Sequence, residues 1–148
     1  MVEPAPPREF VIWPLHITIV PWFPCDDEEK LDSLLAIIAS KHEAFIVNVG
    51  KTEHFGRKDK LTVNLVDDPG NLHRLHWEVF YTLEKRGFPI HQKDHMGEKY
   101  RPHITYQGRR HSLEGDELIV DSFTLVRQVR QKKTGAMIKE VVKDYRLK

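Results

Sequence analysis

The sequence predicts an α+β fold in which antiparallel strands are interspersed with two long helices. Three observations predict this class: segments that alternate between polar and apolar residues, two segments with the apolar spacing of a helix, and turn residues between successive strand segments. Strand runs with interspersed helices are typical of α+β folds and not of doubly wound parallel sheets. We expect a flexible N-terminal lead-in at 1–9 and a single domain over 10–148, a length that can enclose one core.

The first expected element is a strand over Phe10–Val20, in which apolar and polar side chains alternate with a period of two. Pro21 and Pro24 end it, because proline cannot donate to a strand ladder. A helix is expected next. Asp26 as the N-cap and Glu29 three residues later give it the acidic start that suits a helix N-terminus. Its apolar residues recur with helical spacing and form one stripe: Leu31, Leu34, Leu35 and Ile38.

A hairpin and a second helix are expected in the middle of the chain. Ala44–Phe55 is rich in Phe, Ile and Val, and Leu61–Val66 has the pattern of its returning strand after a basic turn. The second helix has clear boundaries, since Asp68 can cap it, Pro69 suits a first turn and Gly87 suits a C-terminal position. Its expected buried stripe is Leu72, Leu75, Val79, Phe80 and Leu83.

The last third of the chain adds further strands. Phe88–Pro102 is expected to be a polar loop, followed by a short strand centred on Ile104 and a second polar loop at 108–116. The segments 118–129 and 136–145 are expected to pair as antiparallel strands. Each half of the chain thus holds a His-Ile-Thr strand and one long helix, which indicates internal pseudo-symmetry.

The overall composition is that of an ordinary globular protein. Hydrophobic residues make up 40% and charged residues 30%, and the net charge of +1 argues against a protein that coats nucleic acid through bulk electrostatics. No apolar run approaches the roughly 20 residues needed to span a bilayer, and the start of the sequence does not resemble a secretory signal. The single cysteine, Cys25, cannot form an internal disulfide, so we expect a cytoplasmic location.

The C-terminal part of the chain is locally basic. Such a ribbon can border an anionic ligand, or it can be a solvated hairpin, which is the commoner meaning of a run of charges. Only Glu140 and Asp144 oppose its basic residues, which are Arg127, Arg130, Lys132, Lys133, Lys139, Lys143, Arg146 and Lys148.

The tripeptide His-Ile-Thr occurs twice, at His16–Thr18 and at His103–Thr105. Residues i and i+2 of a strand project from the same face, roughly 7 Å apart. Each motif therefore presents an imidazole and a hydroxyl together, while Ile17 and Ile104 anchor the strands in the core. If the two strands lie near each other, both imidazoles and both hydroxyls converge on one cleft.

Two imidazoles and two hydroxyls suit chemistry at phosphorus. In-line displacement needs a base for the incoming oxygen and an acid for the departing one, and imidazole, with an ordinary pKa of about 6.5, can serve as either. Hydroxyl donors can hold the non-bridging oxygens, so side chains supply all three functions and we expect no metal or cofactor. One such histidine alone would more commonly be a strand residue satisfied by the backbone. The repeated pattern favours catalysis.

The pair of motifs resembles that of the two-histidine (2H) phosphoesterase superfamily, in particular its 2′-5′ RNA ligase-like and cyclic phosphodiesterase branch. In that family two HxT/S motifs lie on strands of two pseudo-symmetric lobes, and the second is often preceded by proline, as Pro102 precedes His103 here. A helix, a hairpin and a second helix between the motifs are also similar to the family layout. The likeness extends from about Phe10 to the final strand.

The resemblance implies a bilobed α+β fold, with two main helices packed outside antiparallel sheets and a central cleft. It also implies hydrolysis of 2′,3′-cyclic phosphate ends of RNA or nucleotides, or of a related 2′-linked phosphodiester. By position, His16 and His103 would be the acid–base pair, and Thr18 and Thr105 would hold the phosphate. Tyr106 follows the second motif where some relatives carry a basic residue, which leaves the cation for the phosphate unassigned.

Several residues close to the motifs are candidates to bind the substrate. Aromatic side chains there can stack a nucleobase, and arginines can attract phosphate. The alternatives are core or rim packing for the aromatic residues and solvated turn charges for the arginines. The candidates are Trp22, Phe55, Arg57, Tyr100, Arg101 and Tyr106.

Other functions fit the sequence less well. His73 and His76 are three residues apart, a spacing compatible with metal ligands, but no patterned Cys or carboxylate partner follows them, so we predict no metal site. A histidine-triad hydrolase needs a closely spaced string of histidines, which this sequence lacks. A non-catalytic nucleotide- or RNA-binding module that uses the same cleft is the alternative hypothesis. We expect a monomer.

Overall fold

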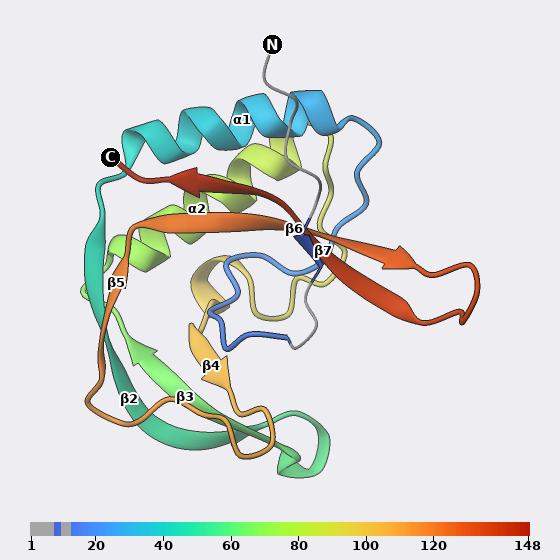
Figure 1. Ribbon diagram of the computed structural model, residues 1–148. Coiled ribbons are helices and arrows are strands. Elements are labelled where there is room, and N and C mark those ends of the chain that lie inside the picture. The colour runs from blue at the N-terminus through green and yellow to red at the C-terminus, as the bar shows by residue number, and fades with distance from the viewer. Residues whose placement is uncertain (1–7, 10–12) are drawn as a thin grey trace.

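The computed structural model describes residues 8–9 and 13–148, which form two antiparallel sheets and two long helices (Figure 1). The helices are α1 (Glu28–Lys41) and α2 (Asn71–Lys85), and two short 3₁₀ helices are η1 (Arg57–Asp59) and η2 (Gly97–Lys99). The strands are β1 (Arg8–Glu9), β2 (Phe45–Phe55), β3 (Leu61–Asp67), β4 (His103–Thr105), β5 (Glu117–Val120), β6 (Ser122–Arg130) and β7 (Met137–Arg146). The predicted α+β class is confirmed.

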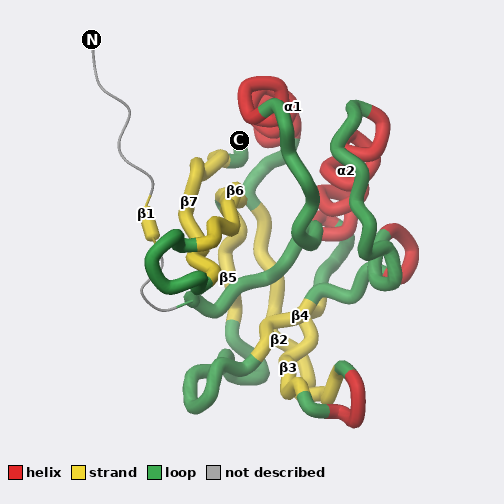
Figure 2. The backbone as a smooth tube through the Cα atoms, turned by 90° about the vertical axis from the view of Figure 1, so that its right-hand side faces the viewer, coloured by secondary structure: helices red, strands yellow, loops and turns green. Residues whose placement is uncertain are grey.

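Each sheet combines strands from distant parts of the chain. The larger sheet has the order β4-β3-β2-β5 and the smaller one β1-β7-β6, and all of these pairs are antiparallel. The two helices lie next to each other at one end of the molecule, and the β2–β3 hairpin curves away from them (Figures 1 and 2). The blue segment that leads to α1 runs between β4 and the β6–β7 hairpin, in the middle of the molecule (Figure 1).

Helix α1 has its N-cap one residue later than predicted. Its N-cap is Asp27, not Asp26, and the Asp27 carboxylate accepts a hydrogen bond from the Lys30 amide at 3.0 Å. This satisfies one of the amides that have no partner within the first turn. The predicted stripe is buried at Leu31, Leu35 and Ile38, with Leu34 only partly buried and Ala39 added to it.

Helix α2 is capped by the residue that the sequence indicated, although from outside the helix. The Asp68 carboxylate accepts hydrogen bonds from the amides of Leu72 and His73, at 3.0 and 2.9 Å. Burial alone would raise the pKa of this acid, but its hydrogen bonds together outweigh that effect and lower the pKa. Gly87 follows the helix with a φ of 92°, a conformation that favours glycine. The buried face is Leu72, Leu75, His76, Val79 and Leu83, while Phe80 is partly buried.

One apolar core unites both helices with both sheets. It draws β-branched and aromatic residues from the strands and leucines from the helices, together with two residues of the loop after α2, Phe88 and Ile90. These two side chains are fully buried, so the segment expected to be a polar loop contributes to the core at its start. Because burial of each such side chain removes apolar area from water, this core fixes the helices against the sheets.

Two expected elements differ from the observed ones. The expected single strand 118–129 is broken at Asp121 into β5 and β6, which belong to different sheets. The break allows the chain to leave the edge of the larger sheet and enter the smaller one. In the expected lead-in at 1–9, Arg8 and Glu9 form β1 and pair with Val141 and Glu140 of β7, and residues 1–7 lie outside the described part.

Only part of the expected strand at Phe10–Val20 is observed, as an isolated bridge. Residues 10–12 lie outside the described part, and over 13–20 a single bridge, at Ile17, joins the segment to a neighbouring strand. The expectation of a strand-like segment thus applies only around this residue. Among the described residues, no helix is both long and apolar enough to cross a membrane.

Candidate active site

The structure brings the two His-Ile-Thr motifs together. Ile17 and Ile104 face each other in an antiparallel bridge. Directly opposed residues of two strands lie on the same face, and their sequence neighbours lie on the other face. The bridge therefore places His16 opposite Thr105 and Thr18 opposite His103, with all four side chains on one face. Ile104 is 4% exposed and packs into the core on the opposite face.

This register makes the two histidines diagonal neighbours across the strand pair. Diagonal neighbours are separated by roughly 7–8 Å. This separation refers to the backbone positions. Both side chains rise from them on the same face, so the two imidazoles can reach one phosphoryl group between them. The antiparallel bridge also gives each histidine the threonine of the other motif as its directly opposed neighbour.

The two imidazoles are held by the same local hydrogen bond. His16 Nδ1 lies 2.8 Å from the carbonyl oxygen of Pro14, and His103 Nδ1 lies 2.8 Å from that of Arg101. In both cases the partner is the carbonyl two residues earlier. A carbonyl oxygen only accepts, so Nδ1 carries the hydrogen and donates in each ring. This leaves Nε2 as the reactive nitrogen, able to accept a proton or, once protonated, to donate one.

An aromatic ring also packs against each imidazole. The rings of Trp13 and His16 are 4.6 Å apart between centroids, at 63°, and those of Phe55 and His103 are 4.9 Å apart, at 70°. Edge-to-face pairs of this kind are favourable. Together with the Nδ1 hydrogen bond they restrict rotation of both rings. The two motifs therefore have the same support although it comes from different residues.

A buried pair of side chains holds the backbone of the first motif. The Tyr100 hydroxyl donates to the Thr18 carbonyl oxygen at 2.7 Å, and His76 Nδ1 donates to the next carbonyl, that of Ile19, also at 2.7 Å. His76 Nε2 in turn accepts from the Gly97 amide at 2.9 Å. The two rings stack with centroids 3.9 Å apart. We refer to His76 and Tyr100 as the buried brace.

Both groups of the buried brace are neutral for a physical reason. His76 is 0% exposed and Tyr100 is 6% exposed. Burial lowers the pKa of the His76 imidazole and raises the pKa of the Tyr100 phenol, because each charged form would lose its hydration. A neutral His76 is also what its two hydrogen bonds require, since Nε2 must accept from an amide. The brace thus fixes a single tautomer.

A turn after the second motif holds the other end of the first motif. Gln107 and Arg110 pair across this turn through their backbones. The Gln107 side-chain amide donates to the Pro14 carbonyl oxygen at 3.2 Å, and the Arg110 guanidinium donates to the Trp13 carbonyl oxygen at 2.8 Å. The Pro14 carbonyl therefore serves both Gln107 and His16. In this way the second motif's turn positions the first histidine.

Three predicted substrate-binding residues lie on the side of the second motif. Phe55 packs against His103, and the Arg101 guanidinium carbon lies 5.1 Å from the centroid of the Phe55 ring. Arg101 also forms an ion pair of 2.7 Å with Glu53. Partial desolvation acts to raise the pKa of Glu53, but the bonds to its cationic neighbours outweigh it and lower the pKa. Arg57 is exposed on η1, directly after the β2 strand that carries Phe55.

The other three candidates have different surroundings. Trp22 is 44% exposed and lines the cavity beside the first motif. The prediction that Tyr100 offers its ring to a base does not agree with the structure, because that ring is buried against His76. Tyr106 is turned away as well: it shares the face of Ile104, stacks on His111 at 4.4 Å and reaches Asn64 through its hydroxyl.

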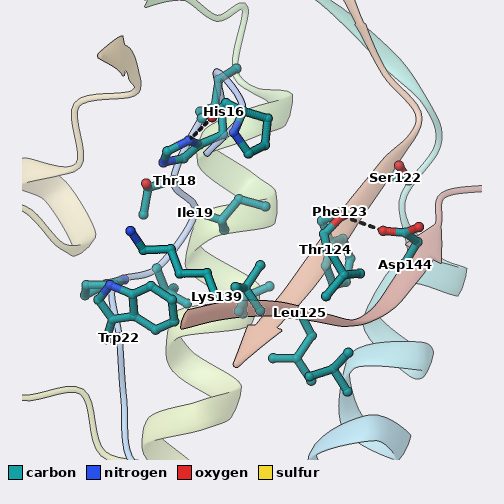
Figure 3. Close-up of a pocket in the computed structure, with 18 of the residues that line it drawn as sticks. His16, Thr18, Ile19, Trp22, Ser122, Phe123, Thr124, Leu125, Lys139 and Asp144 are labelled. Carbon is teal, nitrogen blue, oxygen red and sulfur yellow. Dashed lines mark hydrogen bonds between the residues drawn. The ribbon is translucent and has the colours of Figure 1, made fainter. Parts of the chain in front are cut away.

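A cavity of about 1800 Å³ adjoins the first motif. Segment 13–26 forms one wall and strands β5, β6 and β7 form much of the other. His16 and Thr18 line it, whereas His103 and Thr105 do not. Figure 3 shows the His16 ring and the Thr18 hydroxyl on one side of this segment and Ile19 on the other. Within the described part of the chain, no group of three or more His, Cys, Asp and Glu side chains could hold a metal ion.

Three residues of the site had no role predicted from the sequence: Trp13, His76 and Gln107. For His76 the sequence indicates a metal-ligand spacing with His73 and a place beside the apolar stripe of the second helix, but not the brace. His76 stands four residues after Leu72 and three before Val79, so the helical period places it on the buried stripe of α2. No local signal marks Trp13 or Gln107, since their partners come from remote parts of the chain.

Comparisons with known proteins agree with this fold. TT0787 of Thermus thermophilus is similar with a TM-score of 0.68 and 20% sequence identity, over 90% of this chain and 78% of that chain. The structure of E. coli LigT complexed with 3′-AMP is similar with a TM-score of 0.60 and 17% identity, over 90% of this chain and 76% of that one. LigT complexed with NADP+ gives a TM-score of 0.60 and 17% identity over 95% and 80%. No curated protein sequence matches the chain.

The family of the chain follows from a match over most of its length. The family model of the 2′-5′ RNA ligase superfamily matches residues 5–132, a range that contains both His-Ile-Thr motifs and both helices. The solved structures above share the arrangement of two helices and curled antiparallel sheets. This chain therefore belongs to the 2′-5′ RNA ligase superfamily of two-histidine phosphoesterases.

Proposed function

We propose that this protein is a metal-independent phosphoesterase that hydrolyses 2′,3′-cyclic phosphate ends of RNA or nucleotides. His16 and His103 act as the acid–base pair, and Thr18 and Thr105 hold the phosphoryl oxygens. The observation that supports this proposal best is the antiparallel bridge between Ile17 and Ile104. It gives two histidines and two threonines from distant parts of the sequence a common face.

The identical support of the two imidazoles fits a reaction that needs one acid and one base. Each ring donates from Nδ1 to a carbonyl oxygen at 2.8 Å and offers Nε2 to the substrate. The carbonyl can keep this hydrogen bond in both states of the ring, because Nδ1 carries a hydrogen in the neutral form and in the protonated form. Either histidine can therefore start as the neutral base while the other starts as the protonated acid.

In the proposed reaction, the oxygen of a water molecule attacks phosphorus while Nε2 of one histidine takes a proton from it. The bond between phosphorus and one ribose oxygen breaks on the opposite side, and Nε2–H of the other histidine protonates that oxygen. The product is a ribose phosphate monoester with a free neighbouring hydroxyl. The hydroxyls of Thr18 and Thr105 donate to the non-bridging oxygens, whose negative charge grows in the transition state.

The proposed substrate class draws on the comparisons and on the residues around the motifs. LigT is complexed with 3′-AMP, which is one of the two monoesters that opening of a 2′,3′-cyclic phosphate of adenosine can give. In this chain Trp22 is exposed and able to contact a base, and Arg101 and Arg57 lie on the side of the second motif. The net charge of +1 favours a short RNA end or a nucleotide over a long RNA.

The test is hydrolysis of 2′,3′-cyclic AMP and of a dinucleotide with a 2′,3′-cyclic phosphate end by His16→Ala and His103→Ala. A positioned acid or base typically contributes about 10²–10⁴-fold, so each variant should lose roughly that factor in kcat. His91→Ala, at an exposed residue in the loop after α2, is the matched control and should retain full activity. Activity should also persist in a chelator.

Near-wild-type turnover by either histidine variant would refute the proposed roles. Binding of nucleotides without turnover by the wild-type protein, unaffected by loss of either histidine, would instead identify a non-catalytic nucleotide- or RNA-binding module. Loss of activity in chelator that returns with a divalent ion would refute the metal-independent mechanism and leave the substrate class standing.

A further inference from the structure

Lys139 is a basic residue of β7 that points into the cavity beside the first motif. Side chains alternate between the two faces of a strand, so Lys139 lies on the same face of β7 as Val141, which is buried and also lines the cavity. Lys139 itself is half-buried. Figure 3 shows its side chain extending from β7 toward the segment that carries His16 and Thr18. Arg127 and Lys139 are the two residues of the basic C-terminal ribbon that line this cavity among the described residues.

A single aromatic ring links Lys139 to the first catalytic histidine. The Lys139 ammonium lies 4.6 Å from the centroid of the Trp13 ring, and that ring lies 4.6 Å from the His16 ring. The ammonium is thus no farther from the imidazole than the sum of these two distances. Both groups therefore contact the same Trp13 ring at the wall of one cavity.

Three acidic residues near β7 are engaged by other cations, and Asp144, which lines the same cavity, accepts a hydrogen bond from the Thr124 hydroxyl. Glu140 and Glu28 both pair with Arg127, and Asp32 pairs with Lys143. Among the residues that the structure describes, Lys139 forms no ion pair. Its ammonium lies over the face of the Trp13 ring, in a cation–π contact. A half-buried ammonium that has lost part of its hydration without gaining an anion is positioned to bind one.

The arginines nearest to the motifs are less available. Arg101 is bound to Glu53 and lies over the Phe55 ring, on the side of the second motif. Arg110 donates to the Trp13 carbonyl and to the Gln107 side chain. Of the two Lys and Arg side chains that line the cavity among the described residues, Arg127 is paired with Glu28 and Glu140, which leaves Lys139 to a bound phosphate.

We propose that Lys139 binds a phosphate of the substrate beside His16 and Thr18, an inference that rests on the proposed function. Its ammonium donates a charge-assisted hydrogen bond to a phosphate oxygen, while Trp13 holds the lysine stem in place. The bound group is either the cyclic phosphate that reacts or the adjacent phosphodiester of an RNA end. Both are phosphates, and the choice of substrates distinguishes them.

The first experiment measures binding without turnover. Adenosine 2′-monophosphate and uncharged adenosine are titrated calorimetrically into the wild type, Lys139→Met and Lys139→Arg. Loss of a charged donor should weaken binding of the monophosphate by about 10-fold to 100-fold and leave adenosine unchanged. Lys139→Arg keeps the charge and should retain most of the affinity. Lys133→Met, at an exposed residue of the β6–β7 turn, removes the same charge outside the cavity and should bind like the wild type.

The second experiment compares two substrates in steady-state hydrolysis. Equal losses by Lys139→Met on 2′,3′-cyclic AMP and on the cyclic-phosphate dinucleotide identify the reacting phosphate as the group bound. A loss confined to the dinucleotide identifies the adjacent phosphodiester. Thermal unfolding of Lys139→Met like that of the wild type, expected because the residue is only half-buried on a hairpin, excludes a folding defect.

The outcomes separate this inference from the proposed function. Wild-type affinity of Lys139→Met for the monophosphate, or an equal loss in Lys133→Met, overturns the role of Lys139 even if the protein hydrolyses cyclic phosphates. A wild type that binds the monophosphate through Lys139 but turns over neither substrate supports the phosphate site and refutes the hydrolase. Absence of monophosphate binding by the wild type overturns the site.

Discussion

The buried brace offers the sharpest test of how the first motif is held. In His76→Phe the aromatic stack on Tyr100 can persist, but both hydrogen bonds of the imidazole are lost. The Ile19 carbonyl and the Gly97 amide then lose this partner in a site where the His76 side chain is 0% exposed. The substitution therefore isolates the polar contribution of the brace from its packing.

The expected effect follows from the cost of an unpaired buried group. Each such group costs about 1–3 kcal/mol, so the two together lower the free energy of unfolding by roughly 2–6 kcal/mol. That is a large fraction of the about 5–15 kcal/mol by which a domain is stable. Tyr100→Phe removes one hydrogen bond, to the Thr18 carbonyl, and should cost about half as much.

Urea unfolding followed by far-UV circular dichroism measures the stability of both variants, and kcat is measured at urea-free conditions where each is folded. His95→Phe is the control for the substitution itself and should keep the wild-type midpoint, because His95 is exposed in the loop after α2. A urea midpoint of His76→Phe equal to that of the wild type would refute the reasoning. Lost stability with unchanged kcat would show that the brace supports the fold and not the geometry of the motif.

Two more predictions follow. Burial lowers the pKa of His76 below its ordinary 6.5, so between the two pKa values the unfolded chain binds a proton that the native protein does not. The contribution of neutral His76 to stability should therefore be complete above pH 6.5 and fall as the pH drops through the lowered native pKa. Urea midpoints measured between about pH 8 and 5 should show this decline, and the decline should be smaller in His76→Phe. Thr18→Val and Thr105→Val remove a phosphate donor while keeping the shape of the side chain, and each should lower kcat by about 10²–10³-fold with unchanged thermal unfolding; an effect below about threefold would exclude these hydroxyls from the transition state.

The local elements of this protein are determined by the sequence itself. The stripe Leu72, Leu75, Val79 and Leu83 predicts the buried face of α2, and Asp68 and Gly87 predict its ends, because helical spacing and capping act within a few residues. The α+β class follows from the same local patterns. The repeated His-Ile-Thr pattern likewise indicated which four residues to place on one face, since strand alternation is a local property.

Contacts between residues that are far apart in the sequence could not be predicted from such local patterns. The strand breaks at Asp121 because β5 and β6 join different sheets. The Tyr100 ring stacks on His76, which is distant in the sequence, and the Tyr106 ring stacks on His111, which follows a turn. The rings of Tyr100 and Tyr106, which flank the second motif in sequence, are therefore packed against histidines outside the two motifs. Lys139 and Trp13, by contrast, meet beside His16, although the sequence marked Lys139 only as one of eight basic residues in the C-terminal ribbon and gave Trp13 no role.

The same distinction applies to the catalytic proposal itself. Composition and periodicity gave this chain two strand-like motifs, each with an imidazole and a hydroxyl two residues apart. Only the tertiary fold decided that Ile17 meets Ile104, and hence that the two motifs share a face. The reason is physical: backbone pairing between residues so far apart depends on the core that both helices and both sheets form together, and no short stretch of sequence specifies it.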